Sequence, residues 1–315
     1  MGDRDASEVV ITDVTLREYG QNVPASFLHV FTPQIRIDTA LKLIDAGFCS
    51  LEVLSCVHPR IAPAMDEQAI TTIAGGIGRL ESVHLITLVP NSAGYERFLN
   101  CDLGPDGYNH TLGIFFSAVE AHNLLNLGRT IRETLDEYRL ILKDALPRKI
   151  RVVAYLSAAF GYRPQPESEV LKPDGRELQS YVDMLLDMGA VTVTLSDLQG
   201  VADEKETGKR LATIVSGRQR EFLERLGYHP HHVHGDRGIA NSKVAYEIGI
   251  RRFDSSMGGT GGCVTGAPGN QPTERLLELF EKTGIRTGVH LEKALKVSRF
   301  VERELYRKIN LTAEE

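Results

Sequence analysis

Short apolar runs rich in β-branched residues alternate along this chain with longer segments in which apolar residues recur every three or four positions. The first pattern is typical of buried strands, and the second of helices with one buried face. Strands are predicted at residues 9–15, 50–55, 84–89, 111–117, 150–157, 191–196, 231–234 and 252–255. Helices are predicted at residues 33–46, 65–77, 93–100, 130–146, 175–188, 205–226, 239–248, 273–283 and 291–311.

This order of elements favours a single (β/α)8 barrel, in which each strand is followed by a helix. No low-complexity linker interrupts the series, so residues 1–315 are predicted to form one domain. The barrel would occupy about residues 9–284, and a C-terminal helical tail about residues 288–311. A doubly wound open sheet is the alternative, but no G-x-G-x-x-G follows the first predicted strand.

Composition and charge narrow the functional classes. The 315 residues are 42% hydrophobic and carry a formal net charge of -6, so there is no basic surface for nucleic acid or an anionic membrane. No apolar run is long enough to span a bilayer, and the N-terminal residues lack the apolar stretch of a signal peptide. The 4 cysteines show no C-x-x-C spacing. We therefore expect a cytoplasmic protein with free thiols.

Polar residues gather where the predicted strands end, and in a barrel this is where catalytic groups lie. His232 and His234 end the seventh predicted strand; because side chains alternate across a strand, both imidazoles are expected on one face, with Val233 on the other. Two histidines on one face indicate a metal site. The alternative is a solvated surface turn rich in histidine. The polar residues at the other strand ends are Arg17, Glu18, Glu52, Asn91, Ser117, Glu120, Ser157, Asp197 and Ser255, followed by a glycine-rich loop with Cys263.

Several of these stretches resemble a known family. LREYGQN (16–22) resembles P-R-D-G-L-Q-N, LEVLSCVHPRIAPAMDE (51–67) resembles I-E-V-T-S-F-V-S-P-K-W-V-P-Q-M-A-D, and LVPN (88–91) is shared. FSAVEAHNLLNLGRTIRE (116–133) resembles S-A-S-E-x-F-x-x-x-N-I-N, and TLSDLQG (194–200) resembles S-L-G-D-T-I-G. HVHGDRGIAN and DSSMGGTGGCVTGAPGN resemble H-x-H-D-T-x-G-x-A-x-A-N and D-S-S-V-A-G-L-G-G-C-P-Y-A-x-G-A-S-G-N. Over nearly its whole length the chain resembles the DRE-type TIM-barrel metallolyases, and among them the 3-hydroxy-3-methylglutaryl-CoA lyases.

The resemblance implies a divalent metal site. Glu18 stands at the position of the metal-binding aspartate of the family, His232 and His234 at its two histidine ligands, and Asn270 at an asparagine in or near the metal shell. A mixed set of nitrogen and oxygen ligands suits Mg²⁺ or Mn²⁺, with Co²⁺ and Zn²⁺ as further candidates.

The resemblance also implies four catalytic residues. Arg17 matches the arginine that stabilises the enolate oxygen, and Cys263 matches a loop cysteine that assists proton transfer. Glu52 matches the third letter of the family signature, and Asp197 matches the aspartate of S-L-G-D-T-I-G. Three alternatives stay open: Arg17 and Glu18 as an ordinary ion pair, Cys263 as an inert thiol, and Asp197 as a cap of the loop after the sixth strand.

The implied reaction is cleavage of a 3-hydroxy-3-substituted acyl-CoA into acetyl-CoA and a keto acid. Such a cleavage needs a cation for the alkoxide, a donor for the enolate and an acid that protonates it. Condensation of acetyl-CoA with a 2-oxo acid, as in isopropylmalate or homocitrate synthases, is the second hypothesis, and a barrel that only binds a partner is the third. We expect a small acyl-CoA or hydroxy-acid substrate and a homodimer or higher homo-oligomer.

Departures from the family pattern gather at the same end of the barrel. Glu18 is one methylene longer than the aspartate of the family, and the loop at 162–174 is longer and more polar than the family's. The turn after His234 and the segment from Cys263 to Asn270 are each two residues shorter. These differences predict a substrate other than 3-hydroxy-3-methylglutaryl-CoA.

Overall fold

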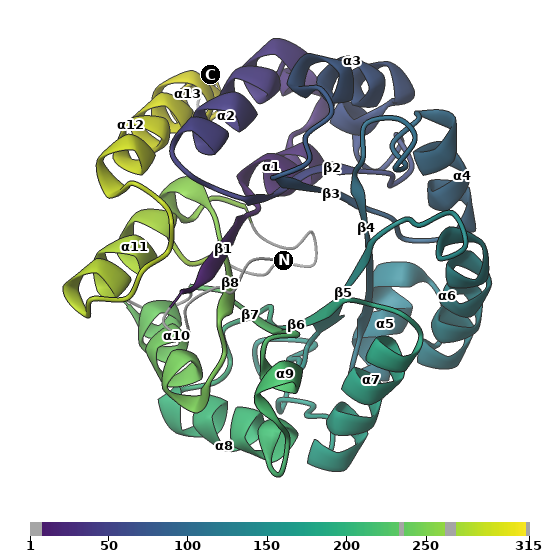
Figure 1. The fold of residues 1–315 in the computed structure, drawn as a ribbon, viewed down its shortest axis with the longest axis vertical. Helices are drawn as coiled ribbons and strands as arrows, with labels where there is room; N and C mark the ends of the chain where they lie inside the picture. Colours follow the sequence, from purple (N-terminus) through teal and green to yellow (C-terminus); the bar gives the residue numbers. More distant parts are fainter. Residues whose placement is uncertain (1–7, 233–235, 262–268, 313–315) are drawn as a thin grey trace.

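The fold, seen in a computed structural model that describes residues 8–232, 236–261 and 269–312, is a closed barrel of parallel strands surrounded by helices (Figure 1). The strands follow one another around the barrel in chain order, and the last closes it by pairing with the first. The predicted TIM-barrel fold is therefore confirmed. The strands are β1 (Val10–Asp13), β2 (Ser50–Ser55), β3 (His84–Leu88), β4 (Thr111–Ser117), β5 (Val152–Ser157), β6 (Thr192–Asp197), β7 (Leu226–Pro230) and β8 (Arg252–Ser255).

Helices cover the outside of the barrel, and most of them lie where the apolar periodicity predicts them (Figure 1). The helix predicted at 33–46 begins as predicted, with Thr32 accepting a hydrogen bond from the Ile35 amide and Pro33 in the first turn. The helices are α1 (Thr15–Asn22), α2 (Pro33–Asp45), α3 (Glu67–Ile77), α4 (Ser92–Asn100), α5 (Glu120–Leu127), α6 (Ile131–Ala145), α7 (Gly175–Asp187), α8 (Glu204–Val215), α9 (Arg220–Leu223), α10 (Arg237–Ile248), α11 (Thr273–Lys282), α12 (Leu291–Val301) and α13 (Arg307–Thr312).

The region around β7 differs from the prediction. The long helix expected at 205–226 is divided into α8 and α9, because Gly217 between them has a φ of 71°, which no continuing helix allows. The seventh strand consequently starts at Leu226 and ends at Pro230, whereas the sequence predicted it at 231–234. This shift changes which histidines stand at the end of the strand.

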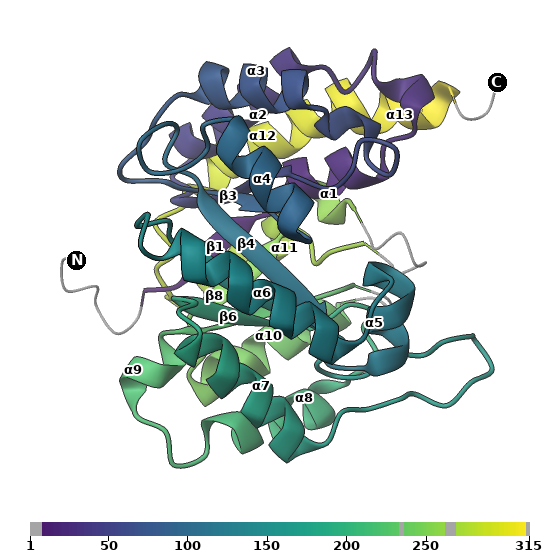
Figure 2. The ribbon, with the colours of Figure 1, turned by 90° about the vertical axis from the view of Figure 1, so that its right-hand side faces the viewer.

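Two short helices at the carboxyl ends of strands were not predicted. One is α1, directly after β1, which carries Arg17 and Glu18; the other is α5, after β4. The predicted C-terminal helix is present, as α12 and α13 joined by a π-helical turn (Glu302–Tyr306). It lies beside α2 and α11 on the outside of the barrel (Figure 2).

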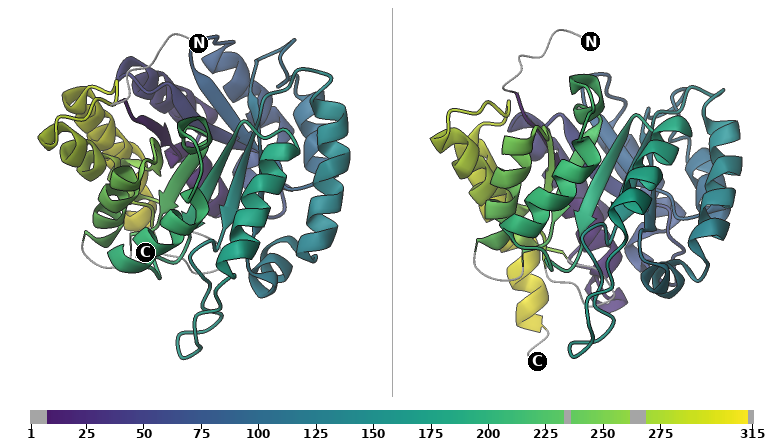
Figure 3. Two further views of the ribbon diagram at one scale, coloured as in Figure 1. Left: turned by 60° about the horizontal axis from the view of Figure 1, so that its bottom comes forward. Right: turned by 90° about the horizontal axis from the view of Figure 1, so that it is seen from below.

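A long loop after β5 projects from the carboxyl end of the barrel. It is held at its base by Tyr162 and Leu171, whose backbones exchange two hydrogen bonds of 2.8 Å. Figure 3 shows this loop and α13 at the same end of the barrel. In the described part of the chain, no helix has the length and apolar character needed to cross a membrane.

A buried imidazole beside β3, at the start of β4, gives a pH test of the fold. The Nδ1 atom of His110 lies 2.8 Å from the hydroxyl of Thr87, and burial lowers the pKa of His110 from 6.5 to about 3. The unfolded chain therefore binds a proton in this pH window that the folded chain does not bind. The stability that the neutral imidazole contributes is complete above pH 6.5 and is lost as the pH falls toward 3.

His110→Gln should flatten the dependence of the unfolding free energy on pH. Between pH 6.5 and about 3, the slope should decrease by up to about 1.4 kcal/mol per pH unit, the value for one proton. Urea unfolding of both proteins at a series of pH values measures this slope. His29→Gln, at an exposed histidine, is the control and should change the stability by less than about 0.5 kcal/mol. Equal slopes for His110→Gln and the unmodified chain would contradict the prediction.

Candidate active site at the carboxyl end of the barrel

A cavity of about 280 Å³ opens at the carboxyl ends of the strands. Because this is the end where TIM barrels carry their catalytic groups, it is the candidate active site. Its lining includes residues from almost every strand end: Arg17, Glu18, Gln21, Asn91, His122, Asn126, Arg129, Tyr155, Ser157, Ser196, Leu198, His229 and His231.

Arg17 holds two carboxylates beside the cavity. Its Nη1 atom lies 2.5 Å from Oε1 of Glu18, and its Nε donates a hydrogen bond of 2.6 Å to Oε2 of Glu52. Burial alone would lower the pKa of Arg17, but the negative charges of Glu18 and Glu52 raise it above its usual value. Burial raises the pKa of Glu52, and the charge of Arg17 opposes this shift. The site therefore contains a permanent cation whose position is fixed by two partners.

Two histidines at the end of β7 lie next to this cluster in the wall of the cavity. The Nδ1 atom of His229 is 3.1 Å from Oδ2 of Asp254 on β8, and its Nε2 is 3.1 Å from Nε2 of His231. A carboxylate at Nδ1 favours the tautomer that leaves the lone pair on Nε2. His229 and His231 are both nearly fully buried. The structure thus brings an i, i+2 pair of imidazoles into the cavity.

Asn270 and Glu18 approach each other across Gly261. A Cβ atom at Gly261 would lie 2.5 Å from Cβ of Glu18 and 3.0 Å from Nδ2 of Asn270, so only glycine fits between them. Nδ2 of Asn270 donates to the carbonyl of Thr260, while its Oδ1 is buried and finds no partner among the described residues. A buried amide oxygen in this state is suited to a cation or a hydrogen-bond donor.

His232, which the sequence predicted as a ligand on the strand end, lies elsewhere. Because β7 ends at Pro230, His232 follows the strand, and its side chain does not line the cavity. A Cβ atom at Gly238 in α10 would lie 3.3 Å from its Nδ1, so the imidazole is directed toward that helix. Burial lowers the pKa of His232, with Asp236 opposing the shift. The second histidine of the prediction, His234, lies outside the described residues, and so does Cys263.

Asp197, predicted as catalytic, closes the loop after β6. Its carboxylate accepts hydrogen bonds of 2.9 Å from the Val201 amide and 3.0 Å from the Ala202 amide. Burial raises the pKa of Asp197 to about 6, although these two amides lower it. Asp197 is absent from the cavity lining, which agrees with the alternative of a loop cap.

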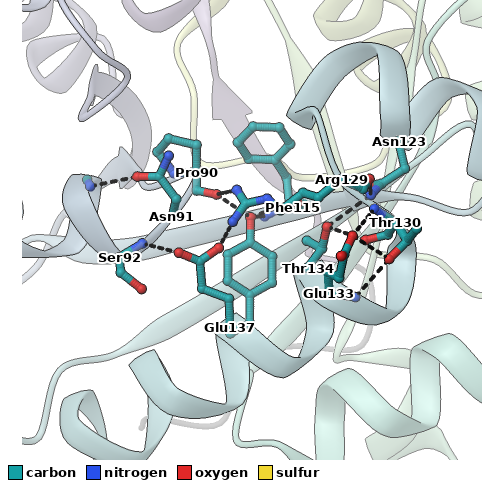
Figure 4. A network of polar contacts seen from close by, with 12 residues as sticks. Pro90, Asn91, Ser92, Phe115, Asn123, Arg129, Thr130, Glu133, Thr134 and Glu137 are labelled. Carbon is teal, nitrogen blue, oxygen red and sulfur yellow. Dashed lines mark hydrogen bonds and ion pairs between the residues drawn. The ribbon is translucent and has the colours of Figure 1, made fainter.

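Arg129 stabilises the side of the cavity formed by β3 and β4, and the sequence did not indicate it (Figure 4). Its Nη2 atom donates a hydrogen bond of 2.8 Å to the Pro90 carbonyl, and its Nη1 pairs with Glu137 on α6. Glu137 in turn accepts a hydrogen bond from the Ser92 amide. The start of α4, the middle of α6 and the loop between α5 and α6 are thereby tied together.

As the side chains stand, no three His, Cys, Asp or Glu residues of the described ranges are grouped closely enough to hold a metal ion. The carboxylate of Glu18 contacts Arg17 through its Oε1 atom. Four residues nevertheless come from neighbouring parts of the barrel. They are His229 and His231 at the end of β7, Glu18 in α1 after β1, and Asn270 in the segment that pairs with His231.

Comparisons with known proteins agree with this geometry. A sequence model described as HMGL-like matches residues 8–301. The hydroxymethylglutaryl-CoA lyase of Bacillus subtilis is 29% identical over 300 residues, which are 95% of this chain and 93% of the relative. The (R)-citramalyl-CoA lyase of Chloroflexus aurantiacus is 29% identical over 311 residues, covering 95% and 92% of the two chains. A structure of an HMG-CoA lyase from Acinetobacter baumannii, in complex with coenzyme A and 3-methylmalate, superposes with a TM-score of 0.82 at 28% identity and covers 96% of this chain and 93% of its own.

Asp197→Ala should destabilise the protein by about 2–4 kcal/mol, because two buried amides lose a charged acceptor. Urea unfolding at pH 7 measures the loss of unfolding free energy. Asp203→Ala is the matched control, since Asp203 caps α8 at an exposed position and should cost only about 1 kcal/mol. A stability of Asp197→Ala equal to that of the unmodified chain would remove the structural role assigned to this residue.

Proposed function

We propose, starting from the fact that the chain belongs to the HMGL-like family and is an enzyme, that it cleaves a carbon–carbon bond of a 3-hydroxy-3-substituted acyl-CoA with the help of a divalent cation. The products would be acetyl-CoA and a keto acid. The observation that carries this proposal is the meeting of a fixed cation, Arg17, with Glu18 and two imidazoles in the wall of one cavity.

The residues present fit a divalent cation in kind. His229 and His231 supply imidazole nitrogens, Glu18 supplies a carboxylate, and the Oδ1 atom of Asn270 is buried without a partner among the described groups. This is the mixed set that Mg²⁺ or Mn²⁺ accepts, with Co²⁺ or Zn²⁺ as further candidates. We assign the histidine pair to His229 and His231 in place of His232 and His234, because His229 lies in β7, His231 directly follows it, and both line the cavity. When bound, the cation would stabilise the alkoxide formed at the substrate hydroxyl.

The remaining chemistry falls to side chains of this chain. As the bond between C2 and C3 breaks, its electron pair moves to C2 and the thioester becomes an enolate, while C3 becomes a ketone. Arg17 lies beside the cavity, where Glu18 orients its Nη1 atom and Glu52 orients its Nε. The guanidinium can therefore stabilise the enolate oxygen without reorganising. The hydroxyl proton leaves and one proton returns to C2, which balances the reaction. Cys263 stays the proposed donor of that proton, and it lies outside the described residues.

Condensation of acetyl-CoA with a 2-oxo acid stays the alternative function, and one assay separates it from cleavage. The purified protein, stripped with a chelator and reloaded with Mg²⁺ or Mn²⁺, is incubated with 3-hydroxy-3-methylglutaryl-CoA and related acyl-CoA compounds, and acetyl-CoA is measured by mass spectrometry. Acetyl-CoA that appears only with the metal supports the proposal. Its consumption in the presence of a 2-oxo acid indicates condensation, and no turnover with any acyl-CoA contradicts both enzyme functions.

Arg17→Gln should lower kcat by roughly 10²–10³-fold, the usual cost of removing one preorganised donor from a developing oxyanion. Glutamine retains an N–H group for the buried Glu52, so the effect on folding should be smaller than that of an apolar replacement such as Arg17→Met. Steady-state kinetics and thermal unfolding are measured together. Gln21→Ala, which removes another neighbour of Arg17 in the same helix, is the control and should lower kcat by less than about tenfold. Near-normal turnover of Arg17→Gln would exclude its role in stabilising the enolate.

The metal site predicts opposite outcomes for two neighbouring histidines. His229→Ala should weaken binding of Mn²⁺ at least about tenfold, because a ligand is lost, whereas His232→Ala should leave the affinity within about twofold. Titration of Mn²⁺ followed by electron paramagnetic resonance measures both. Loss of affinity in His232→Ala, with normal affinity in His229→Ala, would return the site to the pair predicted from the sequence.

A further inference from the structure

His122 is a buried imidazole in the wall of the cavity, with no role in the mechanism above. It lies in the first turn of α5, directly after β4, and is 1% exposed. Its ring is 4.7 Å from the ring of Tyr162, centroid to centroid. Among the described residues, neither Nδ1 nor Nε2 has a hydrogen-bond partner. A buried polar side chain without partners is rare in folded proteins and calls for an explanation.

The position of His122 places it across the cavity from the cluster of Arg17 and Glu18. In the closed barrel, β4 lies opposite β8 and far from β1, yet His122 and Arg17 line the same cavity. A substrate that reacts at Arg17 can therefore extend a substituent toward His122. In the motif S-A-S-E-x-F, which FSAVEAHN resembles, the corresponding position is phenylalanine, whose side chain has no hydrogen-bonding group.

The surroundings of His122 are suited to an uncharged group. Burial lowers the pKa of His122 to about 4, so at neutral pH the imidazole carries one donor and one acceptor. Asn126, Ser157 and Ser196 line the same side of the cavity and are also uncharged. The guanidinium of Arg129 is already bound to Glu137 and to a backbone carbonyl. A carboxylate would find no uncommitted cation among these residues, whereas a hydroxyl can both donate and accept.

We infer that His122 selects an acyl-CoA whose substituent on C3 ends in a hydroxyl group, which the imidazole binds at the β4 side of the cavity. This inference rests on the proposed function, because it assigns the substituent of the same substrate. A methyl group in that place would leave both ring nitrogens buried and unpaired, and sites built to bind a hydroxyl discriminate strongly against analogues that lack it.

The test compares two substrates that differ by one oxygen atom, 3-hydroxy-3-methylglutaryl-CoA and 3-hydroxy-3-(hydroxymethyl)glutaryl-CoA. The unmodified enzyme should favour the hydroxymethyl compound at least about tenfold in kcat/KM. His122→Phe should reduce this ratio to about one or below. His122→Leu introduces a side chain smaller than phenylalanine, so it needs less repacking, and it gives a second measurement of the ratio. His58→Phe, at an exposed histidine of the same cavity, is the matched control and should keep the ratio.

Preference of the unmodified enzyme for the methyl compound, or a ratio that stays within twofold in His122→Phe and His122→Leu, overturns the inference. If the unmodified protein cleaves neither compound, calorimetric binding of the two compounds decides the role of His122, while the assay with other acyl-CoA compounds decides the proposed function. Binding of the hydroxymethyl compound at least about tenfold tighter, with the difference lost in His122→Phe, supports the inference. Equal affinities, or binding of neither compound, overturn it.

Discussion

The buried carboxylate of Glu52 needs a positive charge at the mouth of the barrel, and Arg17 supplies it. Leaving such a carboxylate unpaired in the interior would cost several kcal/mol, so the guanidinium has to stay where the hydrogen bond to Glu52 holds it. Glu18 adds a second negative charge to the same cation. The ion pair between β2 and α1 thus fixes a cation at the carboxyl end of the barrel before any substrate arrives, and the cavity is built around that point.

The fold was predictable because its strands and long helices bury regular apolar faces. The elements that were missed lack such signals. Both α1 and α5 are 8 residues long, and the residues before them, Val14 and Val119, form no side-chain cap. Without a Ser, Thr, Asp or Asn at the start, neither helix is marked in the sequence. Both helices follow strand ends, and they carry Arg17 and His122. Because they lack caps, these segments were the hardest to predict.

The residue types of the candidate site could be predicted from the sequence, but not which histidines face the cavity. Arg17 and Glu18 follow the first strand, Glu52 lies within the second, and the structure brings the three together. Spacing alone cannot distinguish the pair His229 and His231 from His232 and His234, because both pairs have the period of a strand. With β7 starting at Leu226, His229 and His231 line the cavity and His232 does not, and that start depends on the break in the helix before it. The contact of His229 with Asp254, 25 residues away, depends on the closure of the barrel.

The backbone around Asn270 is held independently of the loop that precedes it. The His232 amide donates to the Gly269 carbonyl, the Gln271 amide donates to the Pro230 carbonyl, and His231 forms a bridge with Asn270. These contacts join the end of β7 to the segment at 269–271. Insertions and deletions between Gly261 and Gly269 can therefore accumulate during evolution without displacing Asn270 from the histidines. Among relatives of this chain, the size of the cavity can diverge by changes of loop length while the positions of Asn270 and the histidines are inherited unchanged.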